Sequence, residues 1–204
     1  MYVPPAFRLD DPAARLAVMR AHPFALLVTA GGDGIAATPI PVLVDPDEGP
    51  HGTLYGHLAR PNPQTAHLAA GTEAVVWFHG PHAYVSPRWY AARSENVPTW
   101  NYVAVEARGR PHLLDDATTD AIVARLSDAY EPDPDGWRLD EYEPRRRTAM
   151  VRGIVGFAMP IDAVAGKAKL SQNKTPDDRA GVIAALRAGT DPDGHAIATM
   201  MSAD

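Results

Sequence analysis

Apolar and polar residues alternate with a period of two along much of the first half of the chain, as they do in half-buried β-strands. Segments 24–29 and 35–44 follow this pattern, and Gly31-Gly32-Asp33-Gly34 between them supplies the glycines of a hairpin turn. In the second segment Pro39 and Pro41 have no backbone N–H group to donate to a neighbouring strand, which predicts an edge or bulged strand. Further strands are expected at 53–57, 73–79, 83–86, 100–109 and 153–160.

Other segments carry apolar residues every three or four positions, which is the period of an α-helix. Asp10-Asp11-Pro12 combines an N-cap signal with a proline at the first helical position and predicts a helix that ends near His22. Ile122, Leu126 and Tyr130 are spaced four apart in a later segment. Helices are therefore also expected at 63–70, 118–130 and 176–188, and the segment from about 176 to 204 is expected to be helical.

The number of strands and the scarcity of long helices between them predict the fold class. A parallel sheet needs a crossover helix between successive strands, and these segments provide too few. We therefore expect a mainly β protein with peripheral helices, in which a small antiparallel barrel places a ligand at its rim. The 204 residues are expected to form one domain.

Composition and charge exclude several classes of protein. The chain has no cysteine, which rules out disulfides, thiolate metal sites and cysteine nucleophiles. Its net charge of −6 argues against direct binding to nucleic acid, and the basic run Arg145-Arg146-Arg147 follows acidic neighbours. No apolar run approaches the roughly 18 residues that span a bilayer, and no basic-then-apolar leader is present. We expect a cytoplasmic protein with no membrane partner and no metal site.

The first candidate site lies where a predicted strand ends and a helix begins, at residues 56–64. Asn62 is placed to cap this helix, Pro63 fits its first position, and no acid occupies its first turn. The free amides of a helix N-terminus attract anions, and the guanidinium of Arg60 can donate two hydrogen bonds to one phosphate. A well-capped helix explains the same residues, and both interpretations stay open.

The second candidate site is the segment Lys167-Ala168-Lys169-Leu170-Ser171-Gln172-Asn173-Lys174. Three lysines and three neutral hydrogen-bonding side chains suit a phosphate or the polar edge of a heterocycle. Asp177 and Asp178 occupy the first turn of the next predicted helix, so an anion would bind the side chains of the segment and not the helix end. A solvated basic loop is the alternative.

A third candidate is the aromatic-rich stretch 84–102, whose density suits a flat ligand. Trp89 and Trp100 lie in it, although tryptophans in such positions commonly pack in a core or a dimer interface. Strand alternation places Thr99 and Asn101 on one face and Trp100 on the other. An asparagine on an apolar face needs partners, which either a neighbouring backbone or a ligand supplies.

Several motifs together resemble those of a known family in order and spacing. They are Met1-Tyr2-Val3-Pro4, Gly56-His57-Leu58-Ala59-Arg60 with Asn62-Pro63-Gln64, Gly80-Pro81 with Ala83-Tyr84-Val85-Ser86-Pro87, Trp89-Tyr90, Val97-Pro98-Thr99-Trp100-Asn101-Tyr102, and Lys169-Leu170-Ser171-Gln172-Asn173-Lys174. The chain resembles the PaiB-like family of FMN-binding negative transcriptional regulators. The resemblance implies a split β-barrel of the pyridoxamine-phosphate-oxidase type, a homodimer, and FMN at the subunit interface.

The resemblance also implies roles for individual residues around FMN. Arg60 and either Lys169 or Lys174 would neutralise the phosphate. The other implied contacts are Asn62, Ser171 and Gln172 near the phosphate, His57 at the phosphate or ribityl chain, Thr38, Thr99 and Asn101 at the ring edge, and Trp89 or Trp100 against the ring.

The residues do not identify a reaction, because no paired carboxylates, nucleophile set or glycine-rich phosphate loop is visible. The first hypothesis is an FMN-binding regulator with a flavin-sensing or flavin-dependent redox role, which leaves an FMN-dependent oxidoreductase open. The second is a regulator that acts through protein partners without flavin chemistry. The third is a haem-binding or haem-degrading protein with the same barrel, for which His57 or His195 would be the axial ligand.

Overall fold

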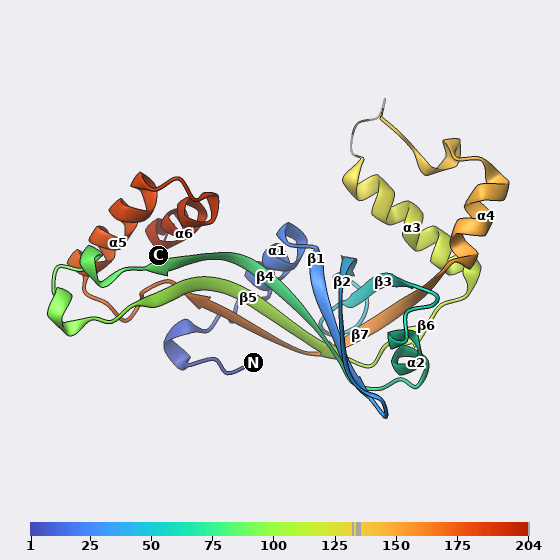
Figure 1. Cartoon of the computed structure of the whole chain (residues 1–204), viewed down its shortest axis with the longest axis horizontal. Helices are drawn as coiled ribbons and strands as arrows, with labels where there is room; N and C mark the ends of the chain where they lie inside the picture. Colours follow the sequence, from blue (N-terminus) through green and yellow to red (C-terminus); the bar gives the residue numbers. More distant parts are fainter. Residues whose placement is uncertain (132, 134–135, 204) are drawn as a thin grey trace. The chain divides into compact units, whose positions relative to one another are not determined.

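A computed structural model describes residues 1–131, 133 and 136–203 of the chain (Figure 1). The chain divides into two compact units, and each is described by itself. The central unit comprises His22–Phe78 and Glu106–Val164. The terminal unit comprises Met1–Ala21, His79–Val105 and Ala165–Asp204.

The strands form a seven-stranded sheet in the order β3-β2-β1-β4-β5-β7-β6, and β3 also pairs with β7. Strand β1 pairs antiparallel with β2 and β4, β2 with β3, and β7 with β3 and β6. The expected antiparallel, mainly β architecture is therefore confirmed. The bounds are β1 Phe24–Gly31, β2 Gly34–Asp45, β3 Thr53–Ala59, β4 Ala74–Val85, β5 Thr99–Gly109, β6 His112–Leu113 and β7 Ile154–Lys169.

The helices lie at both ends of the chain and between strands. The expected helix after Asp11 is α1, and the expected C-terminal helical segment contains α5 and α6, so both predictions are confirmed. The bounds are α1 Pro12–Ala21, α2 Gln64–Ala69, α3 Asp116–Tyr130, α4 Pro144–Arg152, α5 Pro176–Ala188 and α6 Pro192–Ala203, with 3-10 helices η1 Pro5–Phe7, η2 Pro87–Trp89, η3 Arg93–Glu95 and η4 Leu139–Glu141. Among the described residues, none of the helices combines the length and the apolar character that a bilayer crossing requires.

The first two strands form the predicted hairpin, with Gly31 opposite Gly34. The half of β2 that contains Pro39 and Pro41 pairs with β1, and the pairing with β3 starts only at Val42. At these prolines β2 is hydrogen-bonded to one neighbouring strand, β1. This fits their chemistry, because a proline has no N–H group and cannot donate a backbone hydrogen bond to a second neighbouring strand. The prediction of an edge therefore holds for the part of β2 that contains the prolines, whereas β2 as a whole lies between β3 and β1.

Two strand predictions are wrong in length. The segments 73–79 and 83–86 are one continuous strand, β4, although Gly80-Pro81 lies between them. Strand β7 continues nine residues beyond Pro160 to Lys169. Pro81 and Pro160 lie at these two points, and the fixed φ of proline is compatible with extended backbone.

The fully buried core of the central unit includes a large polar side chain, that of Gln64. Its fully buried residues are Leu27, Val42, Leu54, Leu68, Val76, Phe78, Phe157, Met159 and Ile161 together with Gln64. Gly56 contributes to this packing, because a Cβ atom there would lie 3.0 Å from the ring of Phe157. Burial of an amide among apolar groups requires that each of its polar atoms finds a partner.

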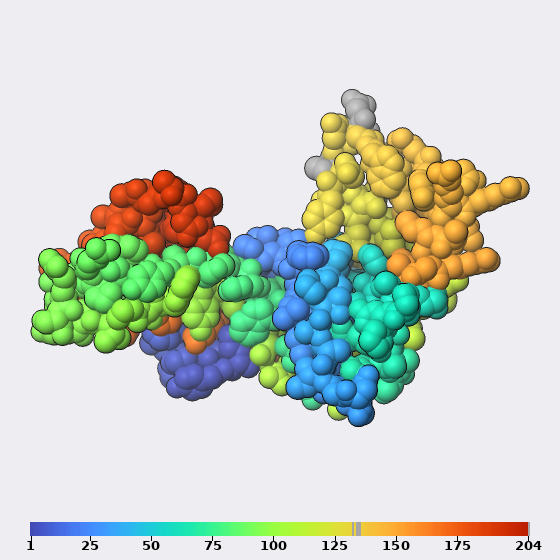
Figure 2. All heavy atoms as spheres, viewed as in Figure 1, coloured from blue at the N-terminus to red at the C-terminus, as the bar shows by residue number. Residues whose placement is uncertain are grey.

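The terminal unit packs α5 and α6 against each other through Val182, Leu186, Ile197 and Met201. Helix α5 also approaches η2 closely, because a Cβ atom at Gly181 would lie 2.1 Å from the carbonyl oxygen of Trp89. Two aromatic side chains of this unit are exposed, Tyr84 of β4 and Trp100 of β5. The part of the chain that contains them is drawn in green in Figure 2.

Candidate functional site

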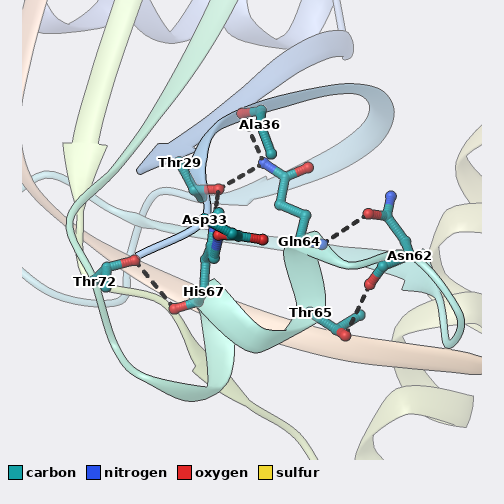
Figure 3. A network of polar contacts seen from close by, with 8 residues as sticks. All are labelled: Thr29, Asp33, Ala36, Asn62, Gln64, Thr65, His67 and Thr72. Atoms are coloured by element: carbon teal, nitrogen blue, oxygen red, sulfur yellow. Dashed lines mark hydrogen bonds and ion pairs between the residues drawn. The ribbon is translucent and has the colours of Figure 1, made fainter. Parts of the chain in front are cut away.

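A network of polar side chains joins the β1–β2 hairpin to α2 within the central unit (Figure 3). We call it the amide–histidine network, and its members are Thr29, Asp33, Thr38, Asn62, Gln64 and His67. Gln64 and His67 stand one turn apart on α2 and so share a face of that helix. Both are buried, as is Thr29, so the network lies under the surface of the unit.

The orientation of the Gln64 amide follows from its neighbours. Its Nε2 lies 2.9 Å from Thr29 Oγ1 and 3.2 and 3.3 Å from the carbonyl oxygens of Leu27 and Ala36. These groups accept hydrogen bonds, so the nitrogen faces them and Oε1 faces the other way. The Thr38 hydroxyl donates to this Oε1 at 2.6 Å. The only hydroxyl proton of Thr38 is therefore committed to Gln64.

We assign the tautomer of His67 from its hydrogen-bond partners. Thr29 Oγ1 accepts from Gln64 and lies 2.8 Å from His67 Nδ1, to which its hydroxyl donates in the assigned tautomer. The imidazole proton of this tautomer is on Nε2, 2.5 Å from Asp33 Oδ1. This hydrogen bond is the main cause that lowers the pKa of Asp33. Donation thus runs in one direction, from Gln64 through Thr29 and His67 to Asp33.

Asn62 completes the exposed end of the network. Helix α2 begins at Gln64, one residue later than expected, but Asn62 Oδ1 accepts a hydrogen bond from the Gln64 amide at 2.9 Å, as a capping side chain does. Asn62 Nδ2 donates to Thr38 Oγ1 at 3.2 Å. After these hydrogen bonds, Thr38 Oγ1 still has one lone pair that can accept a hydrogen bond, and Asn62 Nδ2 still has one hydrogen that it can donate. The half-buried end of the network therefore presents an acceptor beside a donor.

Arg60 is held by backbone groups of the central unit. Its Nε donates to the carbonyl of Arg152 at 2.6 Å and its Nη2 to that of Ile154 at 2.7 Å. Asp116 lies 3.6 Å from Nη2 and lines the same cavity of about 320 Å³. These contacts occupy two donors of the guanidinium, and the nearby carboxylate opposes an anion. The phosphate contact of Arg60 stays a prediction, and so does the anion site at the six-residue helix α2.

His57 lies on β3, beside Gly56, which is paired with Val42. Side chains alternate between the two faces of a strand, so His57 lies on the face opposite to Gly56 and its partner Val42. Thr38 lies on the same face as Val42. His57 and Thr38, both predicted to contact the flavin, therefore point to opposite faces of the sheet. His57 Nδ1 is buried and has no hydrogen-bond partner among the described residues. Burial lowers the pKa of His57.

The lowered pKa of His57 gives a pH-dependent stability. Below about pH 6.5, where an unfolded histidine takes up a proton, the folded state resists protonation, so stability falls as the pH falls until the folded pKa is passed. We expect His57→Gln to remove this part of the acid sensitivity, measured as unfolding free energy between pH 5 and 8. The exposed His51 provides the matched control, His51→Gln, and identical pH profiles for the wild type and His57→Gln would contradict the assignment.

The second cluster lies in the terminal unit and consists of Lys167, Lys169 and Lys174, which we call the lysine cluster. Lys169 Nζ donates to Thr99 Oγ1 at 2.6 Å and to the carbonyl of Trp100 at 2.7 Å. Lys167 Nζ donates to the carbonyl of Tyr2 at 3.3 Å, and Lys174 Nζ to Asn96 Oδ1 at 2.5 Å. Burial, followed by the positive charges of the other two lysines, lowers the pKa of Lys169.

The neutral residues predicted beside these lysines form hydrogen bonds with other groups of the terminal unit. Asn101 and Ser171 are buried, and Asn101 Nδ2 donates to Ser171 Oγ at 3.0 Å and contacts Met201 Sδ at 3.4 Å. Gln172 accepts from the Leu170 amide and donates to the Ala168 carbonyl, each at 2.7 Å. The partners of Asn101 are thus side chains of the terminal unit. Roles of Asn101, Ser171 and Gln172 toward a ligand stay predictions.

The two predicted tryptophans have different surroundings in the terminal unit. Trp89 lies in η2, against α5 at Gly181. Trp100 is 52% exposed, and its ring meets Tyr84 edge-on at 5.9 Å between centroids. Trp100 therefore offers an accessible ring for stacking, whereas Trp89 is partly covered.

Four members of the network were not predicted as site residues from the sequence: Thr29, Asp33, Gln64 and His67. The signal available for them was the one-turn spacing of Gln64 and His67 on a helix and an acid in the preceding hairpin turn. Thr38 and Asn62, which were predicted, lie together at the exposed end of the same network.

Comparisons with known proteins identify the family of this chain. Residues 1–163 match the family described as "Putative FMN-binding domain". The chain is 31% identical to "Protease synthase and sporulation protein PAI 2" of Bacillus subtilis (strain 168) over 202 residues, which are 98% of this chain and 96% of that protein. This result confirms the resemblance to the PaiB-like family.

Solved structures resemble the fold at low sequence identity. The flavocytochrome Anf3 of Azotobacter vinelandii has a TM-score of 0.64 and 16% identity over 83% of this chain and 73% of its own. An FAD and haem binding protein of Mycobacterium smegmatis has a TM-score of 0.60 and 20% identity over 82% and 76%. At sequence identities this low, the similarity shows a shared fold alone. The match over residues 1–163 and the Bacillus relative together place this chain in the family with the putative FMN-binding domain.

Proposed function

We propose that this protein binds FMN as a homodimeric split-barrel protein of the PaiB-like type and that the flavin serves a regulatory or redox role. The observation that carries the proposal is the family match over residues 1–163, which contains all six members of the amide–histidine network. A bound flavin would supply the electron-transfer chemistry, and the protein would supply binding and orientation.

The central unit fits such a ligand in one specific respect. The pyrimidine edge of a flavin presents N–H and C=O groups next to one another. Thr38 offers an acceptor and Asn62 a donor at the exposed end of the network, which is the complementary pair. We therefore propose that Thr38 and Asn62 recognise the ring edge. His57, with its unpartnered buried Nδ1, offers a further polar contact on the other face.

The bound group is tested by purifying the protein, releasing any pigment by denaturation, and identifying it by absorbance and mass. FMN supports the proposal. FAD would correct the cofactor, and a haem band would favour the third hypothesis of the sequence analysis. Protein that carries no pigment and binds none of the three on titration would contradict the proposal.

The acceptor role of Thr38 gives a prediction with a modified ligand. We expect methylation of the flavin N3 to weaken binding to the wild type by about tenfold or more, the equivalent of one hydrogen bond. In Thr38→Val this penalty should largely disappear, whereas Thr38→Ser should bind FMN nearly as well as the wild type does. Affinities are measured by fluorescence titration, with folding checked separately, because Thr38→Val also leaves Gln64 Oε1 without its donor. An equal methyl penalty in wild type and Thr38→Val would contradict the role.

The name of the Bacillus relative, "Protease synthase and sporulation protein PAI 2", refers to sporulation and protease synthesis, and on this basis we propose a regulatory role. The net charge of −6 opposes direct DNA binding, so we propose that regulation proceeds through a protein partner whose binding depends on the flavin. An operator-binding assay at physiological salt would contradict this route if it showed a specific shift.

A further inference from the structure

Helix α4 has two faces with different surroundings (Figure 1). One face packs on α3, where Nε and Nη2 of Arg147 donate to the two carboxylate oxygens of Asp120, each at 2.7 Å. Arg145 and Arg152 lie two turns apart on the opposite face, and Arg146 flanks them. All three of these side chains are exposed, and we call them the arginine face. Figure 2 shows side chains of this orange segment that extend beyond the surface around them.

The guanidinium groups of the arginine face have no acceptor among the residues that the structure describes. The other arginines of the central unit each have one. Carboxylates pair with Arg60, Arg108, Arg125, Arg138 and Arg147, and the carbonyl of Gly71 accepts from Arg110. Carboxylates are not scarce in this chain, which has 25 acidic and 19 basic residues. The lack of partners in the central unit is therefore specific to one face of one helix.

The stability of α4 does not explain these arginines. Arg145 and Arg146 lie in the first turn, where the positive end of the helix dipole disfavours cations. The neighbouring carboxylate, that of Glu143, accepts hydrogen bonds from their backbone amides at 3.0 and 2.9 Å and so caps the helix. The guanidinium groups themselves remain exposed. The helix and its cap together stay positively charged.

We propose that the arginine face docks an acidic segment of a partner protein. A guanidinium presents a planar fork that can bind a carboxylate through two parallel hydrogen bonds. Arginine is also enriched in protein–protein interfaces, where lysine is depleted. The inference rests on the proposed function in one respect, because it gives the regulatory protein contact proposed above a surface and a partner chemistry.

A nucleic acid fits this face less well than an acidic protein segment does. Duplex DNA is a long polyanion whose phosphates continue on both sides of any contact. Asp140, Glu141 and Glu143 directly precede α4 in the chain. Asp116 and Asp140 line a cavity of about 420 Å³ between α3 and α4, so further carboxylates lie beside the packed side of the helix. These acids repel a long polyanion, whereas a short acidic segment can pair with the three guanidinium groups and end there.

Peptide binding tests the inference on the full-length protein. A fluorescein-labelled oligoglutamate is titrated at physiological salt, and its fluorescence anisotropy is recorded. We expect saturable binding of oligoglutamate to the wild type and no binding of an oligoglutamine of the same length. The double variant Arg145→Gln, Arg146→Gln should bind oligoglutamate about fivefold or more weakly, because two of the three exposed positive charges are lost.

The matched control is Arg138→Gln. Arg138 is also exposed in the central unit, but its Nη2 lies 3.4 Å from Asp128 Oδ1, so its charge already has a partner. Its replacement should change the affinity for oligoglutamate by less than about twofold. An equal loss in the control and in the double variant would overturn the inference, and so would equal affinity in the double variant and the wild type.

Charge reversal gives a second readout, which a folding defect cannot produce. The variant Arg145→Glu, Arg146→Glu should lose the binding of oligoglutamate and gain binding of an oligolysine, because the sign of the surface charge changes. Circular dichroism checks that the variants are folded. A folded variant that still prefers oligoglutamate would contradict the inference.

Two other occupants of the arginine face would each overturn the inference. Duplex DNA that binds the wild type more tightly than oligoglutamate does, and loses this binding in the glutamine variant, would identify a nucleic-acid surface. Self-association of the wild type in sedimentation, lost in the glutamine variant, would identify a contact between copies of this chain.

An FMN titration of the same samples separates this inference from the proposed function. Peptide binding through the arginine face in protein that binds no FMN would keep the inference and refute the proposed function. FMN binding in protein that binds no oligoglutamate would refute the inference and leave the proposed flavin binding intact.

Discussion

Replacing Gln64 by glutamate is expected to lower the unfolding free energy by about 3–5 kcal/mol at neutral pH, the range for an uncompensated buried charge. The two side chains have nearly the same shape, so no cavity forms. The change instead puts an oxygen where Nε2 now faces Thr29 Oγ1 and the carbonyls of Leu27 and Ala36. A buried carboxylate facing acceptors loses its solvation and gains repulsion.

The effect of Gln64→Glu should depend on pH with a defined sign. Burial and facing acceptors raise the pKa of the introduced carboxyl above the value of about 4.3 for an unfolded glutamate. The destabilisation is therefore smallest near pH 4 and grows as the pH rises, until the folded pKa is passed. Denaturant unfolding at pH 4 to 8 measures it.

The control for this substitution is Gln172→Glu, at the other glutamine of the chain. Gln172 is half-buried and donates to one carbonyl, so its change should cost much less. Equal effects at the two positions, or a Gln64→Glu protein as stable as the wild type at pH 8, would contradict the assigned amide orientation.

Gly31→Ala is expected to lower the unfolding free energy by about 2–4 kcal/mol, through overpacking and the loss of buried hydrogen bonds. A Cβ atom at this position would lie 2.3 Å from Cδ2 and Nε2 of His67. The imidazole cannot move aside without breaking its contacts with Thr29 and Asp33. The absence of a side chain at Gly31 therefore leaves the space that the His67 ring occupies next to the hairpin.

The neighbouring glycine gives a matched control. A Cβ atom at Gly32 would meet nothing within 4 Å, so Gly32→Ala should change stability little. Thermal unfolding of both variants, with the histidine proton resonances of His67 as a local probe, measures the difference. Equal stability of the two variants would show that His67 does not fill this space.

Much of the fold follows from local sequence signals. The glycines at 31–34 fix the first hairpin, and Asp115 and Thr175 cap helices α3 and α5 through hydrogen bonds to the amides of Thr118 and Asp178. The errors occur at Pro81 and Pro160, where tertiary pairing continues a strand through a residue that often ends one. Local patterns cannot show that a neighbouring strand supplies the ladder.

The candidate site was predictable in part. Asn62 and Thr38 could be predicted because capping chemistry and strand position mark polar residues at element ends. The direction of hydrogen bonding could not, since it depends on which acceptors face Gln64 from β1 and β2 after folding. The partner of Asn101 was likewise hidden, because Ser171 lies 70 residues further along the chain.

Equilibrium titration of flavin-free protein with FMN decides whether this protein binds the flavin, as we propose. FMN is added at constant protein concentration while flavin fluorescence and the visible spectrum are recorded. We expect saturable binding near one FMN per chain, with weaker binding to Thr38→Val than to Thr38→Ser. A fluorescence signal that stays equal to that of free FMN across the titration, in protein shown to be folded, would contradict it.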